Sequence, residues 1–336
     1  MINKVNNAKR PFLLKKSFVA QALFNLILYS HRGKGSNLFW KINARILRFL
    51  ATILVSLLRD PVVSYRLEES RLLLPLSHNL PIIKKCHPYY STNVGRIASI
   101  LKGKYPDLSL IDIGANIGDT VAILRSKSTF PILCIDGDKC FFSILSENAR
   151  AWPDVHLVNS FVGDSTGNFS GRLEILGGTG RLVEDHNSSQ NLEMRKLSDI
   201  VRANPGFAKA KMIKVDTDGF DCKILKSELA LLAELKPVIF FEYDPYFFEK
   251  SEDDGYQIFH DLKNIGYNAA LVFENTGEYL LHVHLNNDLL LEDIHHFYSG
   301  WAGSRYCDIC VFHEVDLDVF RQARSKEIEF FDAHCI

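Results

Sequence analysis

One stretch, residues 108–136, constrains the fold more than any other part of this chain. An apolar run leads into a turn that starts at Gly114 and ends at Gly118, and a helical pattern follows the turn. A second apolar run, residues 131–135, ends in the acid Asp136. Strand, glycine turn, helix, strand and acid together form the opening βαβ unit of a nucleotide-binding α/β sheet. The sequence therefore predicts an α/β fold with a nucleotide site at this turn.

The residues of the turn indicate which nucleotide it binds. The spacing is G-x-x-x-G rather than the dinucleotide pattern G-x-G-x-x-G, and Asp112 stands two residues before the first glycine. A carboxylate there repels a pyrophosphate but attracts a ligand with an amino group and a positive sulfonium. Asp136 lies where a carboxylate accepts hydrogen bonds from ribose hydroxyls. We therefore expect S-adenosylmethionine (SAM), rather than NAD, and these cofactor-binding residues: Asp112, Gly114, Asn116, Gly118 and Asp136.

Two of these acids have plainer interpretations that the sequence leaves open. Asp112 would serve equally to cap the glycine turn. Asp136 would serve as the N-cap of the following helix, which contains Phe141, Ile144 and Leu145. In both cases the carboxylate would stabilise the backbone and would not touch a ligand.

Two later acids are the candidate catalytic residues. Asp216 follows the apolar run 211–215, and Glu242 ends the run 237–242. Because ligands of α/β sheets bind at the carboxyl ends of the strands, we expect both acids to face the same crevice as Asp112 and Asp136. Asp216 is the first candidate for a general base or for the ligand of an acceptor hydroxyl, and Glu242 is the second. Two neighbouring carboxylates would either raise the pKa of one of them or hold Mg²⁺; no metal ligand is assigned.

The chain also resembles a known family in five segments that follow one another in the same order: 112–120, 134–138, 196–200, 212–221 and 237–242. The first, Asp-Ile-Gly-Ala-Asn-Ile-Gly-Asp-Thr, is similar to the signature turn of the FkbM-type SAM-dependent methyltransferases. The resemblance extends over roughly residues 89–312. Asp replaces the family's Glu at positions 136, 218 and 221, and Gly137 replaces its Pro.

The resemblance implies a fold and an activity. The fold is a class I methyltransferase sheet of mostly parallel strands with helices on both faces. The activity is methylation of oxygen, often on sugars of surface polysaccharides, so the expected acceptor is a saccharide hydroxyl. The alternatives are a nicotinamide-dependent oxidoreductase, and a non-catalytic saccharide- or membrane-binding protein that keeps a vestigial methyltransferase fold.

The first sixty residues differ from the rest in charge. They contain eleven Lys and Arg and one acid, Asp60, whereas residues 61–336 carry a net charge of −11. The negative charge of the larger part argues against nucleic acid as a partner. We place a basic helical extension at residues 1–75 and the methyltransferase domain at residues 76–336.

Residues 39–59 are typical of an amphipathic helix with a narrow polar stripe. The stripe contains Lys41, Arg45, Arg48, Thr52, Ser56 and Arg59. Either the helix lies on an anionic membrane surface, or its apolar face docks on the following domain or on a second subunit in a homo-oligomer.

The cysteines bear on the cellular compartment. Seven cysteines, an odd number in a long chain, do not indicate a disulfide framework, so we expect reduced thiols and a cytoplasmic location, peripheral to the membrane if the helix binds lipid. Cys307 and Cys310 form a CxxC motif in a segment that is typical of a strand. Residues three apart in a strand point to opposite faces, so this pair is not expected to bind zinc.

Overall fold

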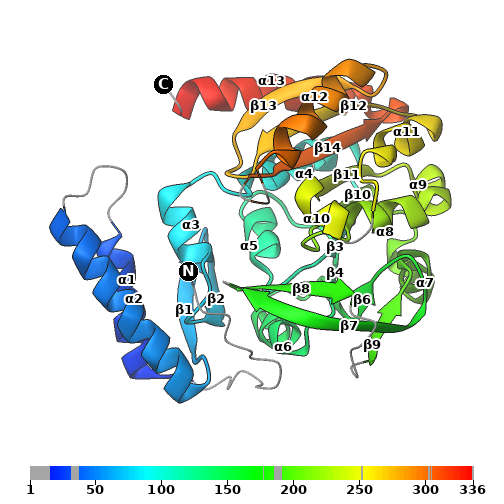
Figure 1. The fold of residues 1–336 in the computed structure, drawn as a ribbon. Coiled ribbons are helices and arrows are strands. Elements are labelled where there is room, and N and C mark those ends of the chain that lie inside the picture. The colour runs from blue at the N-terminus through cyan, green and yellow to red at the C-terminus, as the bar shows by residue number, and fades with distance from the viewer. Residues whose placement is uncertain are drawn as a thin grey trace.

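A mixed sheet runs through the centre of the molecule (Figure 1). The computed structural model describes residues 16–31, 38–176, 178–184, 191–250, 253–301, 303 and 305–334. Within them the sheet has eight strands: β3 (Leu110–Ile113), β4 (Ile132–Asp136), β5 (Val155–Asn159), β10 (Met212–Val215), β11 (Val238–Tyr243), β12 (Tyr267–Glu274), β13 (Tyr279–His284) and β14 (Cys307–His313).

The order of the strands across the sheet identifies the fold class. The order is β13-β12-β14-β11-β10-β3-β4-β5. Strands β5, β4, β3, β10 and β11 pair in parallel. Strand β14 is inserted between β11 and β12 and is antiparallel to both. This is the class I methyltransferase sheet, as the sequence predicted.

Helices cover both faces of this sheet, because its strands are apolar on both sides. One face carries α4 (Thr92–Lys104), α5 (Asp119–Arg125), α6 (Lys139–Asn148) and α13 (Leu317–His334). The other carries α7 (Leu197–Ala203), α8 (Asp221–Ser227), α9 (Leu229–Leu235), α11 (Gln257–Asn264) and α12 (Asp288–Ser299). The short helix α10 (Pro245–Lys250) follows β11.

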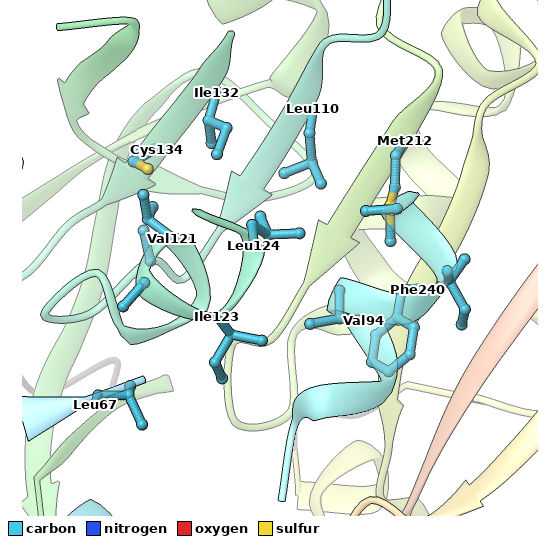
Figure 2. Packing of buried hydrophobic residues seen from close by; sticks show 14 of the residues in the cluster. Leu67, Val94, Leu110, Val121, Ile123, Leu124, Ile132, Cys134, Met212 and Phe240 are labelled. Carbon is cyan, nitrogen blue, oxygen red and sulfur yellow. The ribbon is translucent and has the colours of Figure 1, made fainter. Parts of the chain in front are cut away.

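The core on the first face shows how the helices are held. Figure 2 shows Val94 of α4 and Leu124 of α5 packed toward Leu110, Met212 and Phe240 on three strands of the sheet. All five side chains are buried. Burying apolar surface of this extent is the main stabilising contribution to the fold.

Strand β14 contains the CxxC motif that the sequence places in a strand. It pairs antiparallel with both β11 and β12. Cys307 packs in the core on one face of the sheet, while Cys310 packs in the core on the other face. The two sulfurs therefore diverge, and none of the six described cysteines forms a disulfide bond.

A second, smaller sheet lies beside the central one. Its order is β6-β9-β7-β8. The strands are β6 (Phe161–Val162), β7 (Gly167–Leu176), β8 (Thr179–Glu184) and β9 (Asn191–Arg195). β7 and β8 form a long antiparallel hairpin. We did not predict this sheet from the sequence.

The N-terminal part consists of two helices and a hairpin: α1 (Phe18–Ser30), α2 (Leu38–Leu58), β1 (Val62–Leu67) and β2 (Ser70–Pro75). The short helix α3 (Leu80–Cys86) follows. Asn148 of α6 hydrogen-bonds both backbone groups of Leu73, so the hairpin is tied to the central fold. The amphipathic helix expected at 39–59 is confirmed as α2. The boundary at residue 75 stays a prediction, and side chains on both sides of it share one core.

Within the described part of the chain, none of the helices combines the length and the apolar character needed to cross a bilayer.

Candidate active site

A pocket opens at the carboxyl edge of the sheet, between β3 and β10. The chain runs outward from β3 in one direction through β4 and β5, and in the other through β10 and β11. Such a switch in strand order leaves a crevice above the strand ends, which is where α/β folds bind ligands. The cavity measures about 1210 Å³, counting its open mouth. Five of the seven predicted site residues line it: Gly114, Asn116, Asp136, Asp216 and Glu242.

The glycine turn forms the floor of this pocket. Gly114 has φ +78°, and a Cβ added there would lie 1.7 Å from the backbone oxygen of Asp216. Only glycine therefore lets the turn pass so close to the end of β10. Asn116 has φ +47°, and its side-chain amide donates to the Gly178 carbonyl at 2.9 Å, which ties the turn to the β7–β8 hairpin.

Asp136 lies at the end of β4 and faces the pocket. Its carboxylate accepts hydrogen bonds from the backbone N–H groups of Asn116 at 2.8 Å and Asp138 at 2.9 Å. Each carboxylate oxygen keeps a lone pair for a further donor. Burial raises the pKa of Asp136 to about 7, against the opposing effect of these two hydrogen bonds.

The N-cap interpretation of Asp136 is wrong. Asp138 is the N-cap of α6, and its Oδ1 accepts from Cys140 N at 2.6 Å and Phe141 N at 3.0 Å. Asp136 comes two residues too early, because the chain still has to leave the strand before the helix begins.

Asp112 does not reach the pocket surface. It is fully buried in β3, and its carboxylate has no hydrogen-bond partner among the described residues. The capped-turn interpretation is therefore wrong. The ammonium of Lys214 on the neighbouring strand β10 lies 3.4 Å from Asp112 Oδ1. Burial raises the pKa of Asp112, and Lys214 opposes that rise.

Gly118 also lies outside the pocket lining. It is the N-cap of α5 with φ +86°, and a Cβ there would approach Leu145 at 3.0 Å. The glycine allows α5 to start close to α6 and so holds the turn from behind. Asp112 and Gly118 thus support the residues that line the pocket.

Asp216 and Glu242 line the other end of the pocket. The side chain of Asp216 is 44% exposed, and its Oδ2 accepts from Lys214 Nζ at 3.1 Å. Glu242 is buried at the end of β11. Burial, followed by the charges of Asp216 and Asp218, raises the pKa of Glu242 well above its ordinary value.

Lys214 lies between the carboxylates of Asp112 and Asp216. Burial alone would lower the pKa of this lysine, but Asp112, Asp216 and Asp119 outweigh burial and raise the pKa well above its ordinary value. The lysine therefore stays charged and holds Asp216 in place from below. Its position two residues before Asp216 on a predicted strand was the signal that could have identified it.

Three further residues that were not among the predicted site residues line the pocket. Asp119, in the glycine-turn segment, begins α5, and burial raises its pKa to about 6. Tyr90 precedes α4 and Tyr306 precedes β14, and both line the pocket. Burial, followed by nearby carboxylates, raises the pKa of both tyrosines, so they stay neutral.

Asp308 adds a further acid beside Glu242. The two residues are direct partners in the antiparallel β11–β14 pairing. Burial, followed by the charge of Asp216, raises the pKa of Asp308 to about 8. Among the described residues, no group of three or more His, Cys, Asp or Glu side chains has the arrangement needed to hold a metal ion.

The donors and acceptors at the Asp136 end fit an S-adenosyl nucleoside. Asp136 offers free lone pairs to a ribose diol, while Phe141, Phe161 and Val162 supply apolar walls beside it. A Cβ at Gly137 would collide with the Phe161 ring at 2.2 Å. The glycine that replaces the family's proline therefore makes room for that aromatic wall.

Comparison with known proteins identifies no family for the chain. No family model matches it, and no curated protein does either. Solved structures of methyltransferases are similar to parts of it. The FkbM methyltransferase from Methylobacillus flagellatus KT is 19% identical over 48% of this chain, with a TM-score of 0.34, and the match spans 39% of that protein.

Two further methyltransferase structures match at lower identity. An O-methyltransferase from Bacillus cereus in complex with SAH is 11% identical over 66% of this chain and 80% of that one, with a TM-score of 0.36. A geranyl diphosphate methyltransferase in complex with SAM is 8% identical over 70% and 89%, with a TM-score of 0.39. These values assign no activity to this chain, so the case for a function depends on the pocket.

Proposed function

We propose that this chain is a SAM-dependent methyltransferase that methylates a hydroxyl group, and that its acceptor is a saccharide. One observation carries the proposal: a single pocket joins Asp136 at the end of β4 to the carboxylates of Asp216 and Glu242 at the ends of β10 and β11. The glycine turn lies between these two ends. A nucleoside site and an acidic reaction site are thus continuous.

The cofactor end would hold SAM through Asp136, the Gly114 turn and the apolar walls beside them. When bound, SAM supplies an electrophilic methyl group on a sulfonium. The acids of the lining favour a positive ligand, since Asp119 and Asp216 both line the pocket. Lys214 is directed to Asp112 and Asp216, so its charge is compensated locally.

At the acceptor end, Asp216 is the proposed catalytic base. It is half exposed and reaches the cavity, so an acceptor hydroxyl can donate its proton to the carboxylate. Glu242, whose raised pKa favours the neutral acid, is suited to donating a hydrogen bond that orients the acceptor oxygen. A general base that removes the proton of the acceptor hydroxyl contributes about 10²–10⁴ in rate.

The saccharide assignment is supported by the chemistry of this end. Tyr90 and Tyr306 place aromatic rings beside the carboxylates, and carboxylates hydrogen-bond well to sugar hydroxyls. The acidic lining disfavours a phosphate-rich acceptor such as nucleic acid. The sequence resemblance to FkbM-type enzymes also supports methylation of a sugar oxygen, in surface polysaccharide synthesis in the cytoplasm.

Thermal melting of the full chain tests the cofactor assignment. We expect SAM and S-adenosylhomocysteine (SAH) to raise the melting temperature and NAD to leave it unchanged. At about 100 times the Kd, a ligand stabilises the fold by about 2.7 kcal/mol. Asp136→Ala should lose the shift, while Asp332→Ala, an exposed acid on α13, should keep it.

The rival functions predict different results. A shift with NAD alone would indicate a nicotinamide-dependent oxidoreductase. No shift with any of the three ligands would favour a non-catalytic binding protein. If SAM binds, the next experiment measures the transfer of a labelled methyl group to a panel of neutral saccharides. Asp216→Asn should abolish that transfer while SAH still raises the melting temperature, and unchanged transfer would remove Asp216 from the mechanism.

A further inference from the structure

The helix α2 presents a large apolar face that no other described element covers. The exposed side chains recur at spacings of three or four along the helix and include Phe49, Leu50 and Leu57, which are 66%, 45% and 73% exposed. The side chains on this face are Ile42, Ile46, Phe49, Leu50, Ile53 and Leu57. Water-soluble surfaces rarely carry so many exposed apolar side chains together, so this face marks an interaction site.

The opposite side of α2 is already occupied. Ala51, Leu54 and Val55 pack toward the core through α1. Gln21 of α1 hydrogen-bonds both backbone groups of Ser64 on β1, so α1 itself is fastened to the hairpin. Figure 1 shows the two helices together at one flank of the molecule, beside β1 and β2. Docking on the following domain thus accounts for the inner face alone.

A stripe of cations runs along α2 between these two faces. Arg45, Arg48 and Arg59 are exposed, and Arg48 contacts the ring of His31. Thr52 and Ser56 continue the stripe. Lys41 belongs to the stripe by sequence, but its side chain is not among those that the structure describes. Residues 1–59 contain no Asp or Glu, so no carboxylate from this part of the chain can neutralise the stripe.

We propose that the outer face of α2 binds the surface of an anionic membrane, with the helix lying in the plane of the interface. The apolar side chains would enter the boundary between headgroups and acyl chains, and the arginines beside them would contact anionic headgroups. A second copy of the chain fits this face less well, since pairing two such helices brings two acid-free arginine stripes together. The surface is separate from the pocket, so this proposal does not depend on the proposed function.

Co-sedimentation of the full chain with vesicles tests the proposal. We expect binding to vesicles of equal parts phosphatidylcholine and phosphatidylglycerol, weak binding to phosphatidylcholine alone, and a loss of binding in high salt. Arg45→Gln/Arg59→Gln should lower the partition coefficient roughly 30-fold, as expected for two cations close to an anionic surface. Arg321→Gln/Lys326→Gln, which removes two exposed cations from α13, should have no effect.

A matched pair of variants tests the apolar face. Leu50→Gln/Leu57→Gln should lower binding at least about tenfold. Leu280→Gln/Leu289→Gln serves as the control, because those leucines are 45% and 76% exposed on β13 and α12. Equal binding by the two variants, with unchanged melting temperatures, would overturn the proposal. A second result would also overturn it. In that result the wild-type chain does not bind the anionic vesicles, and sedimentation velocity shows a dimer that Leu50→Gln/Leu57→Gln dissociates.

Discussion

Lys214 is the residue on which the charge balance beneath the pocket depends. Its ammonium lies within 3.4 Å of Asp112 and 3.1 Å of Asp216, and both Lys214 and Asp112 are buried. A buried charge that loses its partner is far more destabilising than the intact pair is stabilising. The lysine therefore matters for the fold and also for the position of Asp216.

Replacing Lys214 tests this dependence. Lys214→Met should lower the free energy of unfolding by about 3–5 kcal/mol, because it leaves the Asp112 carboxylate buried without a counter-charge. The double variant Lys214→Met/Asp112→Asn should recover part of that loss. Urea denaturation measures both. If Lys214→Met unfolds at the same urea concentration as the wild type, the Lys214–Asp112 pair does not contribute to stability in this way.

The pKa of Asp136, about 7, makes cofactor binding depend on pH. Ribose hydroxyls donate to the ionised carboxylate, which forms only as the pH rises through that pKa. The affinity for SAH should therefore increase from about pH 6 to pH 8, by up to tenfold per unit below the pKa. Asp136→Asn should bind SAH weakly, and its affinity should no longer increase with pH over this range. Calorimetric titration at three pH values would show it, and a flat wild-type profile would contradict it.

Some of the site residues could be predicted from sequence because each acid directly follows an apolar run. Asp136, Asp216 and Glu242 all end or follow strands of one parallel sheet, and such ends share an edge. Asp308 could not be predicted, since it faces Glu242 only through the register of an antiparallel pair. Asp112 lies within strand β3 rather than in the turn. Its side chain is buried beside Lys214 and does not line the cavity.

At the scale of the element, the turn from β3 to α5 fixes the geometry of the pocket. Gly114, Asn116 and Gly118 all have positive φ. The β7–β8 hairpin closes over this turn through the bond from Asn116 to Gly178. The turn was predicted from its glycines. The second sheet, in which the hairpin pairs with β9, was not predicted.

Gly114→Ala tests the close approach of the turn to β10. The added methyl group would overlap the Asp216 carbonyl, and φ +78° is strained for alanine, so the turn or the end of β10 must move. We expect a loss of at least about 2 kcal/mol in the free energy of unfolding and weaker SAH binding. Gly103→Ala, where nothing lies within 4 Å, is the matched control and should be neutral or mildly stabilising. Equal behaviour of the two variants would show that the turn does not depend on glycine at this position.

At the scale of the whole molecule, folding gathers carboxyl groups at one edge of the sheet. The pKa values of Asp136 and Asp221 rise to about 7, and that of Asp308 to about 8, with burial as the main cause in each case. The sequence predicted the sheet that brings them together. The small sheet and the N-terminal hairpin lie outside that prediction.

These shifts give the stability a characteristic dependence on pH. The folded chain binds more protons at these acids than the unfolded chain does. The contribution of each acid to the stability is therefore full below its unfolded pKa of about 3.9 and falls as the pH rises from there through its folded pKa. His78, whose pKa is lowered to about 4 by burial, acts in the opposite direction, but only below its unfolded pKa of about 6.5. Melting temperatures without ligand should therefore fall between about pH 6.5 and pH 8.5. Asp308→Asn should reduce that fall, and a rise over this range would show that these acids do not govern the stability.

A crystal structure of the full chain with bound SAH would show directly whether the nucleoside site and the acidic reaction site form one active site. We predict that the ribose hydroxyls bond to Asp136 and that the sulfur lies over the Gly114 turn, toward Asp216 and Glu242. SAH bound in the reverse direction, or outside this pocket, would contradict the proposal of one continuous active site.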